Sequence, residues 1–310
     1  PVVAYLMHWL FNQPYVCLLY DLYPDVAVTL GVVPERSGIV RFWRWLNRRT
    51  WRHAKAIVVL SPTMKQRILD TCPEASGKIT VIHNWADPNL VKPVSKAENW
   101  FAQQHDLQKV FTVMYSGNMG RCHDMDTILA AAAELRYQPV KFVFIGDGAK
   151  RQPCVDQVER LGLTNCLFLP YQPKQHLPFS LTACDLSLVS IDTNVEGLVA
   201  PSKFYGCLAA GRPIAAICEP HSYLRSMLAE AQCGQAFDNG DSSGLAAYIL
   251  TLLTDPVGAT HTGERARRYL LDNFTPERCA HRYLQVVRES ISAAGIWEPA
   301  YVTRTKGRGE

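Results

Sequence analysis

Residues 110–133, VFTVMYSGNMGRCHDMDTILAAAA, decide the fold. The first six, 110–115, form a short run of apolar, β-branched and aromatic residues, which is typical of a buried parallel strand. Ser116-Gly117-Asn118-Met119-Gly120 follows directly, and glycine lets the backbone turn tightly there and lie against a ligand. Residues 124–133 then have the apolar spacing of a helix.

A strand, a glycine turn and a helix N-terminus together form a site for a phosphate or pyrophosphate group, because unpaired N–H groups point at the anion. Arg121 and His123 add side-chain donors at the same place. Two glycines alone also fit an ordinary strand-to-helix turn, so the rest of the chain has to decide between the two interpretations.

The composition indicates a globular protein with a reducing environment. The 310 residues suffice for two medium domains, and 48% apolar residues provide a substantial core. The net charge of +4 is too small to indicate nucleic-acid binding. The ten cysteines include no Cys-x-x-Cys pair, which favours the cytosol over a disulfide framework and predicts no metal site. Because no apolar run reaches about 18 residues, we expect no transmembrane helix.

The chain begins at Pro1, inside an apolar segment, without an initiator methionine. There is no room for a first βαβ unit before Tyr15, so we expect that the sequence is truncated at its N-terminus and that its N-terminal domain is incomplete. The apolar residues 2–11 fit either a helix or a strand.

Strands alternate with helices along most of the chain, which predicts an α/β fold with parallel, doubly wound sheets. The polar, aperiodic residues 89–109 are predicted to link an N-terminal domain (1–88) to a C-terminal domain (110–262). Helices near 263–273 and 276–291 are predicted to form a C-terminal segment (263–294), and 295–310 a loose tail. The predicted strands are residues 15–20, 57–60, 79–83, 110–115, 141–145, 166–169, 186–189, 213–217 and 234–237.

Residues 37–56, SGIVRFWRWLNRRTWRHAKA, predict a helix with an apolar stripe and arginines over most of the remaining surface. No acidic residue occurs between Arg36 and Leu69. A basic helix that carries several tryptophans is typical of helices that contact anionic lipid headgroups. A surface helix with a solvated basic face is the other interpretation.

A second informative stretch is residues 196–214, EGLVAPSKFYGCLAAGRPI. Pro201-Ser202 opens a helix, so Lys203 lies in the first turn, where its ammonium group and the helix dipole act on the same anion. Both this loop and the Gly117 loop follow strands, so Arg121 and Lys203 are predicted to hold one diphosphate from two sides. Glu196 is predicted to accept hydrogen bonds from sugar or ribose hydroxyls. A solvated lysine and an ordinary loop glutamate are the alternatives.

Two carboxylates, Asp21 and Asp25, follow the predicted strand 15–20. Polar residues just beyond the carboxyl end of a parallel strand lie where open α/β sheets bind their ligands, so both are site candidates. Either residue also suits the N-cap of a helix.

The segments YSGNMGR, FVFIGDG, LPYQ and EGLVAPSKFYG, with YDLYPD and HNWAD upstream, resemble the family 4 retaining glycosyltransferases of GT-B fold. The resemblance covers residues 15–287 and is strongest to bacterial and cyanobacterial exopolysaccharide-type sugar transferases. It implies two Rossmann-like domains that face each other across a cleft. It also implies that a nucleotide-sugar donor binds to the C-terminal domain and that the acceptor binds to the N-terminal one.

The resemblance further implies a role for individual residues. Arg121 and Lys203 match the positions that neutralise the leaving diphosphate, and transfer proceeds with retention and without a metal or other cofactor. Asp21 is predicted to face the reacting sugar, while Glu196 matches only loosely the glutamate that contacts the donor. A second glutamate of the family is replaced by Gly206. The implied donor-binding residues are Gly117, Asn118, Gly120, Gly146, Tyr171 and Ser202.

We therefore expect a cytoplasmic transferase, peripheral at the inner membrane face, that moves a sugar from a UDP or GDP donor to a glycan or lipid-linked glycan. A nucleotide-sugar epimerase on the same scaffold stays open, as does a non-catalytic subunit that supports a partner transferase, which Gly206 favours. A nicotinamide dehydrogenase is disfavoured, because residues 116–121 do not complete the G-x-G-x-x-G spacing.

Overall fold

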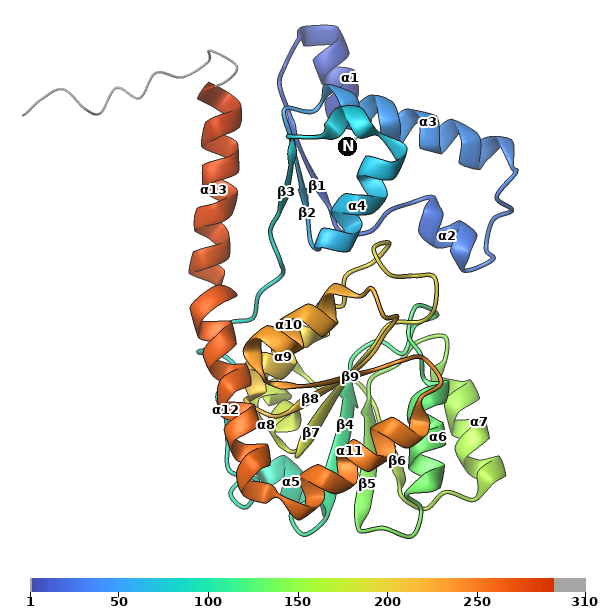
Figure 1. Ribbon diagram of the computed structural model, residues 1–310, viewed down its shortest axis with the longest axis vertical. Helices are drawn as coiled ribbons and strands as arrows, with labels where there is room; N and C mark the ends of the chain where they lie inside the picture. Colours follow the sequence, from blue (N-terminus) through green and yellow to red (C-terminus); the bar gives the residue numbers. More distant parts are fainter. Residues whose placement is uncertain (1, 293–310) are drawn as a thin grey trace, which may run out of the picture.

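The computed structural model describes residues 2–292, which form two α/β units (Figure 1). Within these residues, the N-terminal unit contains a three-stranded parallel sheet of order β1-β2-β3. The C-terminal unit contains a six-stranded parallel sheet of order β6-β5-β4-β7-β8-β9. The prediction of an α/β fold with parallel sheets is confirmed. The predicted loose tail, 295–310, lies outside the described residues.

The N-terminal unit begins with a helix, which settles the ambiguity of residues 2–11. Its elements are α1 (Val2–Phe11), β1 (Val16–Leu19), α2 (Asp25–Thr29), α3 (Gly38–His53), β2 (Ala56–Val59), α4 (Pro62–Thr71), the 3₁₀ turn η1 (Pro73–Ala75) and β3 (Ile79–Val81). Serine side chains begin the two longer internal helices: Ser37 accepts from the Val40 N–H at 3.2 Å, and Ser61 accepts from the Met64 N–H at 3.1 Å.

The C-terminal unit follows the predicted alternation of strands and helices. Its elements are α5 (Trp100–Gln104), β4 (Phe111–Ser116), α6 (Asp126–Glu134), β5 (Val140–Ile145), α7 (Arg151–Leu161), β6 (Cys166–Leu169), η2 (Lys174–His176), α8 (Leu177–Thr182), β7 (Leu186–Ser190), α9 (Lys203–Ala210), β8 (Ile214–Ile217), α10 (Tyr223–Ala231), β9 (Gly234–Phe237), α11 (Ser242–Thr254), α12 (Pro256–Asn273) and α13 (Pro276–Ser292). The strand order reverses between β4 and β7, and open α/β sheets bind ligands beyond the carboxyl ends of the strands at this point.

Apolar side chains cover both faces of the C-terminal sheet. One face packs against α6 and α11 through residues such as Ile128 and Ile249. The other face packs against α9 and α10 through residues such as Phe204 and Leu224, and this cluster continues into Ile57 of the N-terminal unit. The two units therefore share one continuous apolar contact, which fixes the cleft between them.

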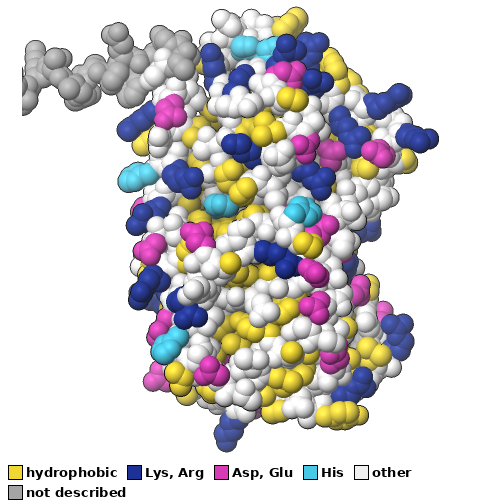
Figure 2. All heavy atoms as spheres, viewed as in Figure 1, with side chains coloured by type: hydrophobic (Ala, Val, Ile, Leu, Met, Phe, Trp, Pro, Cys, Tyr) yellow, Lys and Arg dark blue, Asp and Glu magenta, His cyan; other side chains and the backbone are white. Residues whose placement is uncertain are grey.

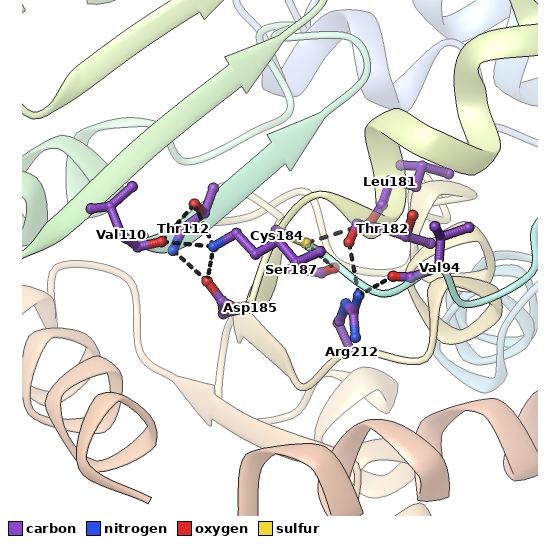
Figure 3. Close-up of polar contacts among 10 residues, drawn as sticks. Val94, Val110, Thr112, Leu181, Thr182, Cys184, Asp185, Ser187 and Arg212 are labelled. Carbon is purple, nitrogen blue, oxygen red and sulfur yellow. Dashed lines mark hydrogen bonds and ion pairs between the residues drawn. The ribbon is translucent and has the colours of Figure 1, made fainter. Parts of the chain in front are cut away.

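Basic side chains hold the segment between the two units to the C-terminal unit. Arg212 donates to the carbonyl groups of Val94 at 2.8 Å and Thr182 at 2.9 Å, as Figure 3 shows. Arg267 of α12 donates to the carbonyl of Val91 at 2.6 Å. The predicted linker is thus anchored along its length, because charged donors satisfy backbone carbonyls that would otherwise be buried without partners.

The same segment contains α5, a helix that the sequence did not predict. Asn99 caps it by accepting from the Phe101 N–H at 2.9 Å, and Phe101 and Ala102 are buried beside β5 and α8. Lys96, just before it, forms an ion pair with Asp185. The helix has five residues, too few to produce a helical period in the sequence.

The last two helices differ partly from the prediction. The predicted start of α12 at Gly263 is wrong: it begins at Pro256, because the Asp255 carboxylate accepts from the Gly258 N–H at 2.9 Å and caps the helix. Figure 1 shows that α13 returns alongside the N-terminal unit, where Val286 packs with Ile82. None of the helices within residues 2–292 has both the length and the apolar composition needed to cross a bilayer.

Candidate functional site

A cavity of about 820 Å³ lies between the two units, at the carboxyl ends of the C-terminal strands. Loops that follow β1, β3, β4 and β6 meet there with the start of α9. Its C-terminal wall includes most of the predicted donor-binding residues: Gly117, Asn118, Gly120, Arg121, Tyr171, Ser202 and Lys203. The structure therefore brings together residues from loops that are far apart in the sequence.

The glycine turn after β4 packs directly on the loop after β5. Gly117 has a φ of 130°, and its N–H donates to the Ile145 carbonyl at 2.8 Å. Gly146 also has a φ of 130°, and a Cβ atom on it would lie 2.2 Å from the Gly117 carbonyl oxygen and 3.2 Å from the Tyr171 ring. Glycine is required here because two backbone segments and one aromatic ring meet. Gly146 itself is buried beneath the cavity wall.

Lys203 is the only lysine of α9 and lies at its first residue, as predicted. Its Nζ lies 3.9 Å from the centre of the Tyr115 ring, and it donates to the Tyr115 hydroxyl and, at 3.3 Å, to the Asn118 carbonyl. Burial lowers its pKa from 10.5 to about 7. No carboxylate forms an ion pair with it in residues 2–292. A partly buried amine without a carboxylate partner favours an anionic ligand.

Arg121 and His123 differ in what they offer to a ligand. Arg121 is exposed, lines the cavity, and has no ion pair with a carboxylate in the described part of the chain. The Nδ1 atom of His123 lies 2.7 Å from the Ser190 carbonyl, which accepts its proton. Burial, and then the charge of Lys203, lower the pKa of His123 to about 4, so the ring is neutral.

Glu196 lies outside the cavity lining and joins the two units instead. Its side chain is 1% exposed and accepts from the Thr63 hydroxyl at 2.6 Å, while its carbonyl accepts from Arg67 at 3.1 Å. Gly197 lies equally close to α4, since a Cβ atom there would be 2.8 Å from the Thr63 carbonyl oxygen. The structure does not bring Glu196 to Lys203 and Gly117, and its role in orienting a donor stays a prediction.

The two aspartates after β1 have different surroundings. Asp21 lines the cavity opposite the C-terminal wall, and burial raises its pKa. Asp25 begins α2 and forms an ion pair with Arg44 at 2.7 Å, away from the cavity. Of these two candidates, the structure places only Asp21 where it can meet a ligand.

Three residues of the N-terminal side were not assigned from the sequence. Tyr23, Trp85 and Asp87 line the same cavity as Asp21. Trp85 and Asp87 belong to the HNWAD segment that follows β3, and Tyr23 to the YDLYPD segment that follows β1. Their position beyond the carboxyl ends of strands was the available signal, but their spacing follows no motif with a stated chemistry.

A second cavity, of about 730 Å³, lies at the opposite end of the C-terminal sheet, beside Pro213 and the start of β4. Its basic residues are largely engaged: Lys96 pairs with Asp185, and Arg212 and Arg267 donate to backbone carbonyls of the linker. The amino ends of parallel strands are also not where such sheets bind ligands. The cavity between the units is therefore the candidate site.

Comparison with known proteins identifies the family of the chain. Residues 96–269 match the family model described as glycosyl transferases group 1, and residues 1–90 match the model described as glycosyltransferase family 4. The chain is 27% identical over 295 residues to the probable glycosyltransferase WbjE of Pseudomonas aeruginosa, covering 94% of this chain and 72% of that protein. It is 28% identical over 212 residues to the putative colanic acid biosynthesis glycosyl transferase WcaI of Escherichia coli, covering 66% and 51%.

Solved structures share the fold. HepE of Anabaena, in complex with UDP and glucose, has a TM-score of 0.73 at 20% identity and covers 93% of this chain and 74% of its own. A sucrose-phosphate synthase of Thermosynechococcus elongatus has a TM-score of 0.76 at 20% identity, covering 94% and 71%. The predicted GT-B arrangement is confirmed by these neighbours.

Proposed function

Because the chain belongs to the glycosyl transferases group 1 family and is a glycosyltransferase, we propose that its donor is a nucleoside diphosphate sugar and that transfer proceeds with retention. The observation that carries the proposal is Lys203, a partly buried amine without a carboxylate partner in residues 2–292, in the wall of the cleft. A diphosphate is the ligand that compensates such a charge at the end of a helix.

The C-terminal wall supplies what a departing diphosphate needs. Lys203, at the start of α9, and the Gly117 turn both line the cavity. Arg121 adds a second cation at the surface. In the transition state the leaving nucleotide gains negative charge, and fixed positive groups in a desolvated site stabilise that charge more than water does.

Tyr171 is the proposed contact for the base. Its ring is 55% exposed and lies against Gly146, one loop away from the diphosphate turn. An aromatic ring held by backbone on one face offers its other face for stacking. HepE of Anabaena was solved with UDP and with UDP-glucose, which makes UDP the first nucleotide to test, followed by GDP.

The acceptor is proposed to bind the N-terminal wall, with Asp21 facing the reacting sugar. Asp21 comes from the loop after β1 and lines the same cavity as Lys203. This arrangement places the donor and the acceptor on different units, so that transfer occurs between them. A glycan or lipid-linked glycan is the proposed acceptor class, and WcaI, which is described as a colanic acid biosynthesis enzyme, is a relative with a polysaccharide role.

We also propose that α3 contacts an anionic membrane surface from the cytoplasm. Figure 2 shows basic side chains over the part of the surface that α3 forms. Arg41, Arg49 and Arg52 have no ion pair with a carboxylate among the described residues. The exposed apolar side chains of the helix are Ile39, Phe42, Trp43 and Trp45. Tryptophan and arginine together favour the lipid–water interface.

Vesicle flotation tests this membrane contact. The protein is expected to float with vesicles that contain phosphatidylglycerol and to remain behind with neutral phosphatidylcholine vesicles. Added salt is expected to weaken the association, because the headgroup attraction is screened. A Trp43→Ala/Trp45→Ala double variant should lose it. Equal binding of the double variant would contradict the proposal.

An activity assay tests the transferase function. The protein is incubated with UDP-glucose, UDP-N-acetylglucosamine or GDP-mannose, with and without a lipid-linked oligosaccharide fraction. Release of nucleotide that depends on the acceptor, with the donor's anomeric configuration kept in the product by proton NMR, supports the proposal. Conversion of a donor without an acceptor would identify an epimerase. A folded protein that binds donor and never consumes it would identify a non-catalytic subunit.

A further inference from the structure

We propose that the acceptor group that enters the cleft is an uncharged sugar, bound by Tyr23, Trp85, Asp21 and Asp87, which we name the acceptor subsite. The inference rests on the proposed function, because a donor on the C-terminal wall leaves this opposite wall for the acceptor. It selects among acceptors: a neutral sugar residue is favoured over a phosphate-headed lipid or a uronic acid.

The two walls of the cavity differ in the charges that they carry. Among the described residues that line the cavity, every Lys, Arg and His comes from the C-terminal unit. The charged residues of the N-terminal wall are Asp21 and Asp87. A phosphate or carboxylate placed against Asp21 and Asp87 would be repelled by both carboxylates. Sugar hydroxyls, in contrast, donate hydrogen bonds to carboxylates.

Two aromatic side chains of the N-terminal wall also suit a sugar. Tyr23 is 46% exposed and Trp85 is 40% exposed, and both line the cavity, so each ring has surface that a ligand can contact. Each is also braced from behind: Tyr23 stacks on Trp43 with ring centres 6.2 Å apart, and Trp85 meets Tyr283 edge-on at 6.2 Å. Rings that are already fixed lose little conformational entropy when a ligand binds, and their apolar faces suit the C–H face of a sugar.

The cavity is large, and both units line it. Its volume of about 820 Å³ lies near the upper end of the roughly 300–1,000 Å³ that hold one drug-sized ligand. Asp21 and Asp87 line this cavity with Tyr23 and Trp85, and within residues 2–292 only the Oδ1 atom of Asp87 is engaged, by the Asn89 N–H at 2.7 Å.

The test measures binding of small sugars to the protein in saturating UDP, by saturation-transfer NMR titration. The neutral probes are the methyl α-glycosides of glucose, galactose and mannose, and the anionic probe is methyl glucuronide. At least one neutral glycoside is expected to bind at least tenfold more tightly than the glucuronide. Trp85→Ala and Tyr23→Ala are each expected to weaken that binding about tenfold, with the UDP affinity unchanged.

Two further variants separate charge and fold effects. Trp45→Ala is the matched control, because Trp45 is 50% exposed and does not line the cavity, and it should leave sugar binding unchanged. Asp87→Asn removes one negative charge, so the affinity for methyl glucuronide should come closer to the affinity for the neutral glycoside. If Trp85→Ala lowers the unfolding temperature, Trp85→Phe keeps a ring at the position and should retain most of the binding.

The outcomes are distinct. If UDP does not bind to the folded protein, the proposed function fails before the acceptor subsite is reached. If UDP binds and no neutral glycoside does, or the glucuronide binds as tightly, or Trp85→Ala and Tyr23→Ala both leave sugar binding intact, the acceptor subsite is overturned.

Discussion

The two walls of the cleft use different parts of the chain for recognition. The C-terminal wall combines backbone turns at Gly117 and Gly146 with the cation of Lys203. The N-terminal wall presents two carboxylates and two aromatic rings among apolar side chains such as Val26, Leu30 and Leu90. A backbone wall tolerates little change at its glycines, whereas a side-chain wall can be altered one residue at a time.

The largest effect is expected from Gly146→Ala. The new Cβ atom would lie 2.2 Å from the Gly117 carbonyl oxygen, and the residue would have to keep a φ of 130°. Strain of about 3 kcal/mol would displace the turn, so UDP affinity should fall roughly a hundredfold. Gly162→Ala is the control, because its φ of 61° is also positive but no atom lies within 4 Å of the new Cβ. Isothermal titration calorimetry with UDP measures the affinity of both variants. Unchanged affinity in Gly146→Ala would break the comparison.

The next effect is a pH dependence that comes from Lys203. Its pKa of about 7 means that the free protein loses this proton above neutral pH. A bound diphosphate favours the protonated amine, so UDP affinity should fall by up to about tenfold per pH unit above pH 7. Lys203→Met should abolish this slope. A wild-type affinity that is flat from pH 7 to 9 would contradict the account.

The same shift predicts the stability of the protein without nucleotide. Between pH 7 and 10.5 the unfolded chain binds the Lys203 proton and the folded protein does not, because the folded pKa is lower. The contribution of Lys203 to the free energy of unfolding therefore rises with pH across this window. Denaturant titrations at several pH values measure the free energies of unfolding of the wild type and Lys203→Met. The wild-type value minus the variant value should rise as the pH rises.

A smaller effect is expected from Arg121→Ala. Arg121 is exposed, so solvent screens its attraction for a diphosphate, and its removal should cost about 1 kcal/mol, or roughly fivefold in UDP affinity. Asp87→Asn, on the opposite wall, should change UDP affinity less than twofold. If Asp87→Asn lowers UDP affinity more than Arg121→Ala does, the assignment of the diphosphate to the C-terminal wall is wrong.

The smallest effect on binding is expected from Glu196→Gln. Its carboxylate bonds Thr63 across the two units and does not reach the cavity, so UDP affinity should change less than twofold. The amide oxygen can still accept from Thr63 but without the charge, so the free energy of unfolding should fall by no more than about 1 kcal/mol. A comparison of UDP with UDP-glucose tests whether Glu196 orients the donor. If it does, Glu196→Gln would weaken binding of UDP-glucose and leave binding of UDP unchanged.

Local patterns predicted the C-terminal unit well. The β6 strand was predicted at its observed bounds, and the Gly117 turn lies where the sequence placed it. Each of these features depends on neighbouring residues: apolar runs form strands, and glycine permits the turn. The start of α12 was missed because Asp255-Pro256 was not recognised as a cap.

Contacts between distant segments could not be predicted. Lys203 meets Tyr115, which lies 88 residues earlier in the chain, and Glu196 meets Thr63, 133 residues earlier. Trp85 joins the cavity through the packing of the two units. Because such pairs depend on how the units dock, the sequence indicated that Lys203 binds an anion but not that its pKa is near 7.

The most direct test of the central claim is a calorimetric titration of UDP and GDP into the wild type and Lys203→Ala. The account predicts that one of the two nucleotides binds the wild type at micromolar concentration. It also predicts that binding to the variant is at least tenfold weaker, or about 1.4 kcal/mol, the size of a charge-assisted contact. Equal affinity for both proteins, or no binding to a folded wild type, would contradict the assignment of the C-terminal wall as the donor site.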